Sequence, residues 1–299
     1  MDLRRLARRC LAWAWLALLG SGSGGATGGD LPDVRAAGVL RHLGVPYANF
    51  VSGSGDGMDV ELIRGFAAHL GIRYEFVETD WKRAFGDLTG RHARGAGRHA
   101  ELLEETPVRG DLLANGVTIL EWRREVADFS APTFPSGVWL IARADASLSP
   151  IRPSGNLARD IGLVKTAIGG RSVLALENTC LDPKLYAVAE TGAHVRLLPH
   201  VRNLNEMAPA ILRGDAEASL LDVPDALVAL EKWPGEIKVI GPVSEAQVMG
   251  VAFRRESPQL RAAFDRYLET IRADGTFRRL VEKYYPAVPD YFPEFFAQR

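Results

Sequence analysis

Segments with helix character and segments with strand character alternate along nearly the whole chain after residue 30. Segment 58–71 places four apolar residues near one helix face and ends at Gly71, whereas 72–79 alternates like a half-buried strand. The same succession recurs from 171 to 242. Such alternation predicts an α/β fold with mostly parallel sheets and helices on both faces.

Two breaks in this alternation divide the chain. Residues 134–137 fit a crossover from a first group of elements to a second, and 241–247 would carry the return. With 299 residues and 47% hydrophobic content, the chain can bury two modest cores. We therefore expect two lobes, lobe 1 formed by 30–134 and 249–299 and lobe 2 by 138–244.

Residues 1–26 have the pattern of a secretory signal peptide: four arginines, a ten-residue apolar stretch, then Gly24-Gly25-Ala26 as a cleavage site. Ten apolar residues are too few to span a bilayer, so we expect cleavage and a periplasmic protein, with retention as an anchor as the alternative. Removal leaves 32 basic and 36 acidic residues, a mild charge that argues against a nucleic-acid surface. It also leaves Cys180 as the only cysteine, so an intramolecular disulfide is excluded.

The stretch 110–134 carries the strongest functional signal. It sets Thr118 and Arg123 five residues apart, just before an extended apolar run. The planar fork of an arginine gives two parallel hydrogen bonds to a carboxylate and stays charged when desolvated. We expect the two residues to form a carboxylate clamp; for the arginine alone, a surface salt bridge is the alternative.

The order Thr118, Arg123 and then Asp-Phe-Ser-Ala-Pro at 128–132 resembles the family 3 periplasmic solute-binding proteins, in which such a pattern leads to the interdomain crossover. Three further segments resemble the family in the same order: 57–81, 212–227 and 271–286. The resemblance covers roughly residues 35–288. It implies a type II periplasmic-binding-protein fold, with two interlobe crossovers and a ligand held between lobes that close by hinge motion.

The resemblance also implies a site that draws on both lobes. Its first-lobe candidates are Tyr47, Asn115, Gly116, Thr118 and Arg123, and its second-lobe candidates are Thr179, Cys180 and Asp222. Arg123 and Thr118 would hold a carboxylate with nearby backbone N–H groups, and Asp222 would accept hydrogen bonds from an α-ammonium. Tyr47 would form a wall of the cleft. The alternatives are helix capping for Asp222 and a core position for Tyr47.

Two departures from the family pattern bear on the ligand. Gly44 stands where amino-acid binders often carry an acidic residue, which weakens the case for a cationic side chain in the ligand. Asn178-Thr179-Cys180 replaces the usual Gly-Thr-Thr. Asn178 accepts a left-handed backbone well. Cys180 loses one hydroxyl contact, which points away from a standard amino acid.

Some segments carry separate expectations. Residues 90–109 have no counterpart in the compact family pattern, so we expect a surface insertion in lobe 1 with a short helix near 100–105. Its two histidines are too few for a metal site, and we expect no metal or cofactor. We expect a helix over 182–192, and an aromatic tail at 284–296 that wraps along the surface of its own lobe.

The leading functional hypothesis is a monomeric periplasmic protein that passes a small carboxylate-bearing, amino-acid-like solute to an inner-membrane ABC permease. Cyclohexadienyl dehydratases share the fold and the export, and they need a general acid in the cleft, for which Glu177 is the nearest candidate. Segment 203–227 is also similar to the binding domain of F-type membrane-bound lytic transglycosylases. A muropeptide-sensing role without catalysis is therefore a further alternative.

Overall fold

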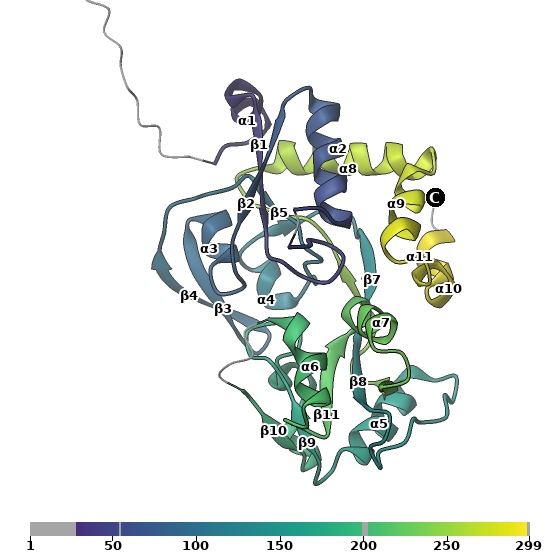
Figure 1. Cartoon of the computed structure of the whole chain (residues 1–299). Helices are drawn as coiled ribbons and strands as arrows, with labels where there is room; N and C mark the ends of the chain where they lie inside the picture. Colours follow the sequence, from purple (N-terminus) through teal and green to yellow (C-terminus); the bar gives the residue numbers. More distant parts are fainter. Residues whose placement is uncertain (1–27, 54, 199–202, 298–299) are drawn as a thin grey trace, which may run out of the picture.

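The computed structural model describes residues 28–53, 55–198 and 203–297, so the signal peptide predicted for 1–26 lies outside the described residues. Two five-stranded sheets, each flanked by helices, form two lobes that lie one above the other in Figure 1. The two-lobed α/β fold is thus confirmed. Within the described part of the chain, no helix combines the length and the apolar character needed to cross a membrane.

The sheet of lobe 1 has the strand order β2-β1-β5-β14-β6. Its strands are β1 (Val39–Gly44), β2 (Arg73–Glu78), β5 (Leu112–Leu113), β6 (Asp128–Phe129) and β14 (Ala252–Phe253). β1 runs parallel to β2 and β5, whereas β14 is antiparallel to β5 and β6. The parallel strands are those that the β/α alternation links. β14 arrives from the other lobe, so no crossover helix sets its direction.

Helices cover this sheet on both faces. They are α1 (Leu31–Ala37), α2 (Met58–Leu70), α3 (Ala84–Thr89), α4 (Glu121–Arg124), α8 (Pro258–Ala273), α9 (Thr276–Tyr284), α10 (Val288–Tyr291) and α11 (Pro293–Ala297). α2 buries its apolar stripe and ends at Gly71, whose left-handed backbone lets its N–H bond back to the last turn. Phe66 of α2 packs edge-on against Phe264 of α8, with ring centres 5.3 Å apart. α2 is thereby fixed with its N-terminal turn close to the interface between the lobes (Figure 1).

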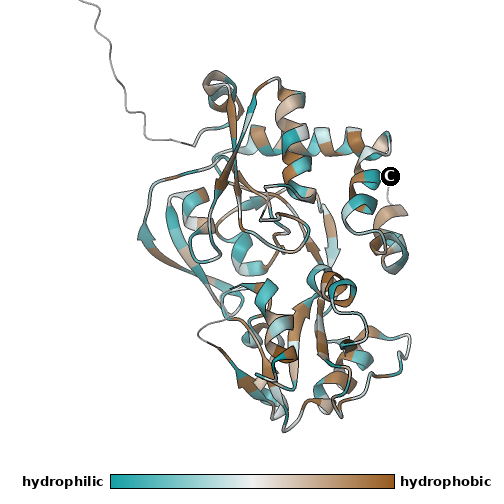
Figure 2. Ribbon diagram, viewed as in Figure 1, coloured by the Kyte–Doolittle hydropathy of each residue, from teal (hydrophilic) through white to brown (hydrophobic). Residues whose placement is uncertain are grey.

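The sheet of lobe 2 has the order β10-β9-β11-β8-β12. Its strands are β8 (Val138–Arg143), β9 (Ser172–Leu174), β10 (His194–Arg196), β11 (Ala218–Asp222) and β12 (Ile237–Pro242). Its helices are α5 (Leu157–Ala167), α6 (Met207–Leu212), α7 (Val223–Lys232) and the 3₁₀ helices η1 (Pro183–Tyr186), η2 (Ala189–Thr191) and η3 (Leu204–Glu206). β9 is parallel to β10 and β11, and β8 is antiparallel to β11 and β12. The hydrophobic central strands stand out in brown in Figure 2.

The helix predicted over 182–192 is wrong. Two short 3₁₀ helices occupy this segment, and Ala187 between them has a left-handed backbone (φ 52°) that interrupts any continuous helix.

The two connections between the lobes run side by side. Strand β7 (Phe134–Ser136) of the outgoing connection pairs antiparallel with β13 (Gln247–Met249) of the return. The strands of the lobe 1 sheet lie within 39–129 and 252–253, and those of the lobe 2 sheet lie within 138–242. The lobe boundaries at single-residue precision stay a prediction.

The segment 90–109 forms a hairpin rather than a loop with a helix. β3 (Arg91–Ala96) and β4 (His99–Glu105) pair antiparallel around a turn that contains Gly97 (φ 67°). The predicted helix near 100–105 is therefore wrong. A helix of six residues gains little by itself, whereas the hairpin pairs its backbone and packs on α4. A methyl group at Gly95 would lie 2.9 Å from Trp122 Nε1, so glycine permits this close approach.

The aromatic tail contacts both lobes. Tyr285 packs against Phe50 and Phe134, with ring centres 5.1 Å and 4.8 Å away. Tyr291 of α10 lies 6.3 Å from Trp139, which belongs to β8 of lobe 2. The expectation that the tail stays on its own lobe is therefore wrong, because Tyr291 also contacts lobe 2. Figure 1 shows α10 and α11 of this tail in yellow beside α9 and to the right of β7.

Candidate functional site

Side chains from the two lobes meet in the interior between the sheets. The Tyr47 hydroxyl, from the turn after β1, donates a hydrogen bond to Asp222 at the end of β11. The Cys180 thiol donates to the other oxygen of Asp222, with Sγ and Oδ2 3.4 Å apart. Tyr47, Cys180 and Asp222 are at most 5% exposed. The structure thus joins a first-lobe aromatic to two second-lobe residues, as a site between lobes requires.

The turn that carries Tyr47 is held on both sides of this interface. Tyr47 stacks on Phe50 with ring centres 5.7 Å apart and meets Trp81 edge-on at 6.2 Å. The next residue, Ala48, adopts a left-handed backbone (φ 44°), and its N–H donates to Asn205 Oδ1 of lobe 2 at 3.0 Å. Tyr47 therefore has a fixed position at the interface between the lobes, where it is also part of the buried hydrophobic core.

Arg123 on the short helix α4 is 1% exposed. Its Nη1 donates to the Thr118 carbonyl at 2.9 Å, and its guanidinium carbon lies 5.3–5.5 Å from the ring centres of Trp81, Phe85 and Trp122. Among the described residues no carboxylate lies within ion-pair distance of it. Burial lowers the pKa of Arg123, while nearby Cys180, Tyr186 and Asp222 oppose that shift. The surface salt bridge is contradicted.

Several buried polar atoms on the segment around Arg123 have no hydrogen-bond partner. These atoms are the side-chain nitrogen and oxygen of Asn115, the Thr118 hydroxyl oxygen and Arg123 Nε. Buried polar groups in native proteins are nearly always paired, so such a group of free donors and acceptors is typical of a site for a polar molecule. The segment is also tied to the interlobe connection, because Ile119 N–H donates to the Val248 carbonyl at 2.9 Å.

Asp222 occupies the position before α7, but its side chain makes no capping hydrogen bond. Its two oxygens accept from Tyr47 and Cys180, and the Asp225 backbone N–H also lowers its pKa, so a role in the site stays a prediction beside helix capping. Burial raises the pKa of Asp222 to about 6, although the Tyr47 and Cys180 hydrogen bonds lower it in part. Asp225, one turn on, is also buried, and burial together with the charge of Asp222 raises its pKa. An ammonium group would relieve this local excess of buried negative charge.

Gly116 and Thr179 shape the site without presenting free groups to it. Gly116 has φ 65°, a Cβ there would lie 2.5 Å from Phe50 Cδ2, and its N–H donates to Asp59 Oδ2 at 2.7 Å. The Thr179 hydroxyl donates to the Leu176 carbonyl at 2.8 Å and accepts from Leu181 N–H at 3.0 Å. Asn178 takes the left-handed backbone expected of it, with φ 62°.

Sequence reasoning missed two groups of residues at this interface. Trp81 ended a segment that resembled the family but received no role, although it contacts both Tyr47 and Arg123. The Tyr186 hydroxyl donates to the Cys180 carbonyl at 2.5 Å and accepts from Gln247 Nε2 at 3.0 Å. Tyr186 lies in the segment for which a continuous helix was predicted, and Gln247 lies in the return connection. Because the two are far apart in sequence, no local pattern indicated that they would meet.

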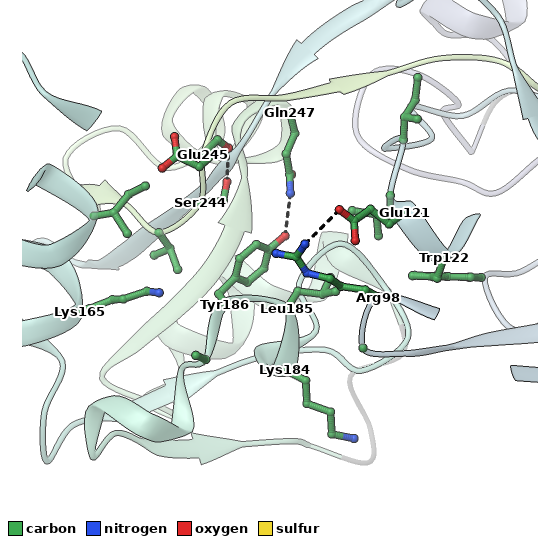
Figure 3. Close-up of a pocket in the computed structure, with 16 residues that line it drawn as sticks. Arg98, Glu121, Trp122, Lys165, Lys184, Leu185, Tyr186, Ser244, Glu245 and Gln247 are labelled. Carbon is green, nitrogen blue, oxygen red and sulfur yellow. Dashed lines mark hydrogen bonds and ion pairs between the residues drawn. The ribbon is translucent and has the colours of Figure 1, made fainter. Parts of the chain in front are cut away.

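A pocket of about 520 Å³ opens beside this buried cluster, and we call it the mouth pocket. Its wall combines the tip of the β3–β4 hairpin, the start of α4, η1, one face of α5 and the return connection (Figure 3). The residues that line it are Gly97, Arg98, Ile119, Leu120, Glu121, Trp122, Ile161, Lys165, Lys184, Leu185, Tyr186, Ala187, Val243, Ser244, Glu245 and Gln247. Trp122 and Tyr186 are shared, since each also contacts or neighbours the buried cluster.

Asp59 supports the site from the first turn of α2, and its titration is testable. Asp59 Oδ1 has no partner, and burial raises the pKa of the carboxyl to about 7. Between pH ~4 and ~7 the folded protein keeps a proton that the unfolded chain gives up, so folding stability falls by up to about 1.4 kcal/mol per pH unit. Asp59→Asn keeps an acceptor for Gly116 and removes this cost. We expect the variant to gain stability relative to the native protein as pH rises from 5 to 8, measured by urea denaturation.

His42 does not disturb this comparison. Burial lowers the pKa of His42 to about 4, so its contribution to stability changes with pH in the opposite sense. His42 is present in both the native protein and Asp59→Asn, so its contribution cancels in the difference between their unfolding free energies. A difference in unfolding free energy that stays constant from pH 5 to 8 would show that Asp59 ionises normally.

Comparison with known proteins places the chain in a family. Residues 106–287 match the family model described as bacterial extracellular solute-binding proteins, family 3. The membrane-bound lytic murein transglycosylase F of Desulfosudis oleivorans is 27% identical over 235 residues, which cover 78% of this chain and 44% of that protein. The chain thus spans less than half of that relative. The L-cystine-binding protein TcyJ of Escherichia coli K12 is 26% identical over 77% of this chain and 74% of its own length.

Solved structures agree on the fold. An ancestral arginine-binding protein bound to arginine superposes with a TM-score of 0.65 at 21% identity, covering 83% of this chain and 98% of that one. An ancestral amino-acid-binding protein, AncCDT-1, described as a precursor of cyclohexadienyl dehydratase, gives 0.63 at 22% identity, covering 85% and 98%. The family match extends over more than half of the chain and includes the clamp segment and the Asp222 strand. The chain belongs to the bacterial extracellular solute-binding proteins of family 3.

Proposed function

We propose that this protein captures a small carboxylate-bearing, amino-acid-like solute between its lobes in the periplasm and delivers it to an ABC permease. One observation carries the proposal: a buried arginine with no anionic partner in the described part of the chain lies at the same interlobe interface as a buried carboxylate. A zwitterion supplies the missing charge at each end. The names of the relatives, which include arginine-, cystine- and amino-acid-binding proteins, support an amino-acid-like ligand.

The proposed binding mode uses the unpartnered atoms first. The ligand carboxylate pairs with Arg123 and takes hydrogen bonds from the Thr118 hydroxyl and the Asn115 amide. The ligand ammonium replaces the Tyr47 hydroxyl as a donor to Asp222. Apolar atoms of the ligand lie against the rings of Tyr47 and Trp81, and closure of the lobes removes water from all these contacts.

The environment of Gly44 bears on the ligand side chain. A Cβ at Gly44 would lie 2.6 Å from Phe76 Cε2, so this position has no room for an acidic side chain. The arginine-binding relatives therefore do not establish arginine as the ligand here. The ligand that we propose interacts with this chain chiefly through its α-carboxylate and α-ammonium groups.

Native mass spectrometry of freshly purified protein is the most direct test, because a closed interlobe site retains its ligand through purification. We expect an added mass consistent with an amino acid or a close derivative. Titration calorimetry with the twenty standard amino acids, using protein unfolded and refolded to release the ligand, then ranks candidates. Absence of both a retained mass and any amino-acid binding would contradict the proposal.

Two alternatives are distinguished by the same preparation. The dehydratase alternative is weakened at Glu177, which forms an exposed ion pair with Lys184 at 3.1 Å and is therefore not a desolvated general acid. Turnover of prephenate or arogenate, followed by absorbance of the aromatic product, would favour an enzyme. Because the lytic transglycosylase relative matches 78% of this chain, muropeptides belong in the calorimetric panel as well.

A further inference from the structure

The mouth pocket is large, and its wall joins the proposed amino-acid site at shared residues. Trp122 adjoins Arg123 and faces its guanidinium at 5.3 Å, and Tyr186 bonds to the Cys180 carbonyl. Tyr186 thus lies between the buried cluster and the pocket, since it lines the pocket and bonds to Cys180. Apolar side chains of Ile119, Leu120, Ile161, Leu185 and Val243 line the pocket.

Two cationic side chains that line the mouth pocket, Lys165 and Arg98, are relevant to its ligand, and the Arg98 side chain is 82% exposed. Figure 3 shows the Lys165 amine directed toward Tyr186 and the Arg98 guanidinium paired with Glu121. Among the described residues, Lys165 has no carboxylate within ion-pair distance. Arg98 contacts Glu121 at 3.3 Å through one of its nitrogens, which leaves its other N–H groups for a second acceptor.

The other charged side chains of the wall are Glu121, which pairs with Arg98, and Lys184 and Glu245. Lys184 extends away from the pocket in Figure 3 and pairs with Glu177. Glu245 is exposed at the rim, and its carboxylate points away from Tyr186 in the same view. On a largely apolar wall, Lys165 is therefore the cationic side chain that has no ion-pair partner among the described residues.

We infer that the mouth pocket is a specificity subsite for the far end of an elongated amino acid, and that this end carries a carboxylate recognised by Lys165 and Arg98. The inference rests on the proposed function, because the α-carbon groups of the ligand must be held at Arg123 and Asp222. The β3–β4 hairpin is then a specificity element, since its tip supplies Arg98. Glu125 anchors the hairpin by accepting from Ala100 N–H at 2.7 Å and contacting His99 at 2.8 Å.

A matched ligand series tests the length and the charge separately. L-Glutamate, L-2-aminoadipate and L-2-aminopimelate extend the distal carboxylate by one methylene at each step. L-2-Aminoheptanoate keeps the longest chain but ends in a methyl group. We expect calorimetric affinity to rise along the acidic series and 2-aminopimelate to bind at least ~10-fold more tightly than 2-aminoheptanoate, about 1.4 kcal/mol.

Variants in the pocket identify the partners of the distal carboxylate. Lys165→Met and Arg98→Met should each weaken 2-aminopimelate by roughly 5- to 10-fold and leave 2-aminoheptanoate unchanged. Lys184→Met is the matched control, because this lysine lines the same pocket but directs its amine outward; we expect no effect on either ligand. The side chains of Lys165, Arg98 and Lys184 are accessible to solvent, so we expect all three variants to fold.

The outcomes separate this inference from the proposed function. Equal affinity for 2-aminopimelate and 2-aminoheptanoate, or equal losses for both ligands in Lys165→Met, would overturn the subsite. Preference for glutamate over 2-aminopimelate would do the same, while amino-acid binding itself stood. Failure of these four compounds and of all standard amino acids to bind would overturn both.

Discussion

Replacing Arg123 with methionine is expected to weaken ligand binding by at least 100-fold while the protein stays folded. The guanidinium is buried, lies over three aromatic rings and has no anionic partner among the described residues until a ligand supplies one. Removing one partner of a buried ion pair costs ~3–5 kcal/mol, or on the order of 10²–10³ in dissociation constant. Calorimetry with the amino acid identified by native mass spectrometry measures this loss.

Methionine is preferred to alanine because it fills most of the space among the three rings without leaving a large cavity. Arg254→Met is the matched control. Arg254 is 5% exposed, but its guanidinium donates to the Gly110 and Gly29 carbonyls of lobe 1, away from the site. We expect Arg254→Met to lower the melting temperature and spare affinity. Unchanged affinity in Arg123→Met would refute the carboxylate clamp.

Asp222→Asn should reduce affinity by a similar factor, roughly 10²–10³, because the ligand ammonium loses its counter-charge in a desolvated site. Stability should respond differently. Burial raises the pKa of Asp222 to about 6, so the ionised side chain is held at a cost in the ligand-free protein. We therefore expect Asp222→Asn to melt at the same temperature as the native protein or higher at pH 8, measured by calorimetric unfolding without ligand.

Asp182→Asn provides the contrast within lobe 2. Asp182 is also buried, but its carboxylate accepts from the N–H groups of Asn178 and Lys184 and so stabilises the turn that leads to Cys180. We expect this variant to lose stability with little change in affinity. If Asp222→Asn bound the ligand as tightly as the native protein, ammonium recognition would have to lie elsewhere.

The fold was largely predictable because it depends on local periodicity. α2 and the strands beside it follow from an apolar stripe, a glycine cap and an alternating segment, and these features lie close together in sequence. The directions of β8 and β14 depend on chain that crosses between lobes, so the alternation did not determine them. The hairpin at 91–105 was missed because its strands are exposed on a mixture of charged and small residues and carry no apolar alternation.

Two candidate site residues were named from the sequence because their side chains suit one chemistry. Arg123 lies on α4 and Asp222 at the end of β11, and both are buried, while their roles in binding stay a prediction. Tyr186 and Gln247 were not predictable, because their hydrogen bond joins segments 61 residues apart through a backbone that no local pattern specifies. For the same reason the mouth pocket, which combines five separate segments, has no signature in the sequence.

The aromatic tail that bridges the lobes has a kinetic consequence. A ligand enclosed by Tyr47, Arg123 and Asp222 cannot diffuse away until the lobes separate, because these residues are almost fully buried. Separation must also disturb the packing between Tyr291 and Trp139. The residence time of a bound solute is then limited by the rate at which the lobes separate, and the contact of Tyr291 with Trp139 helps to set that rate.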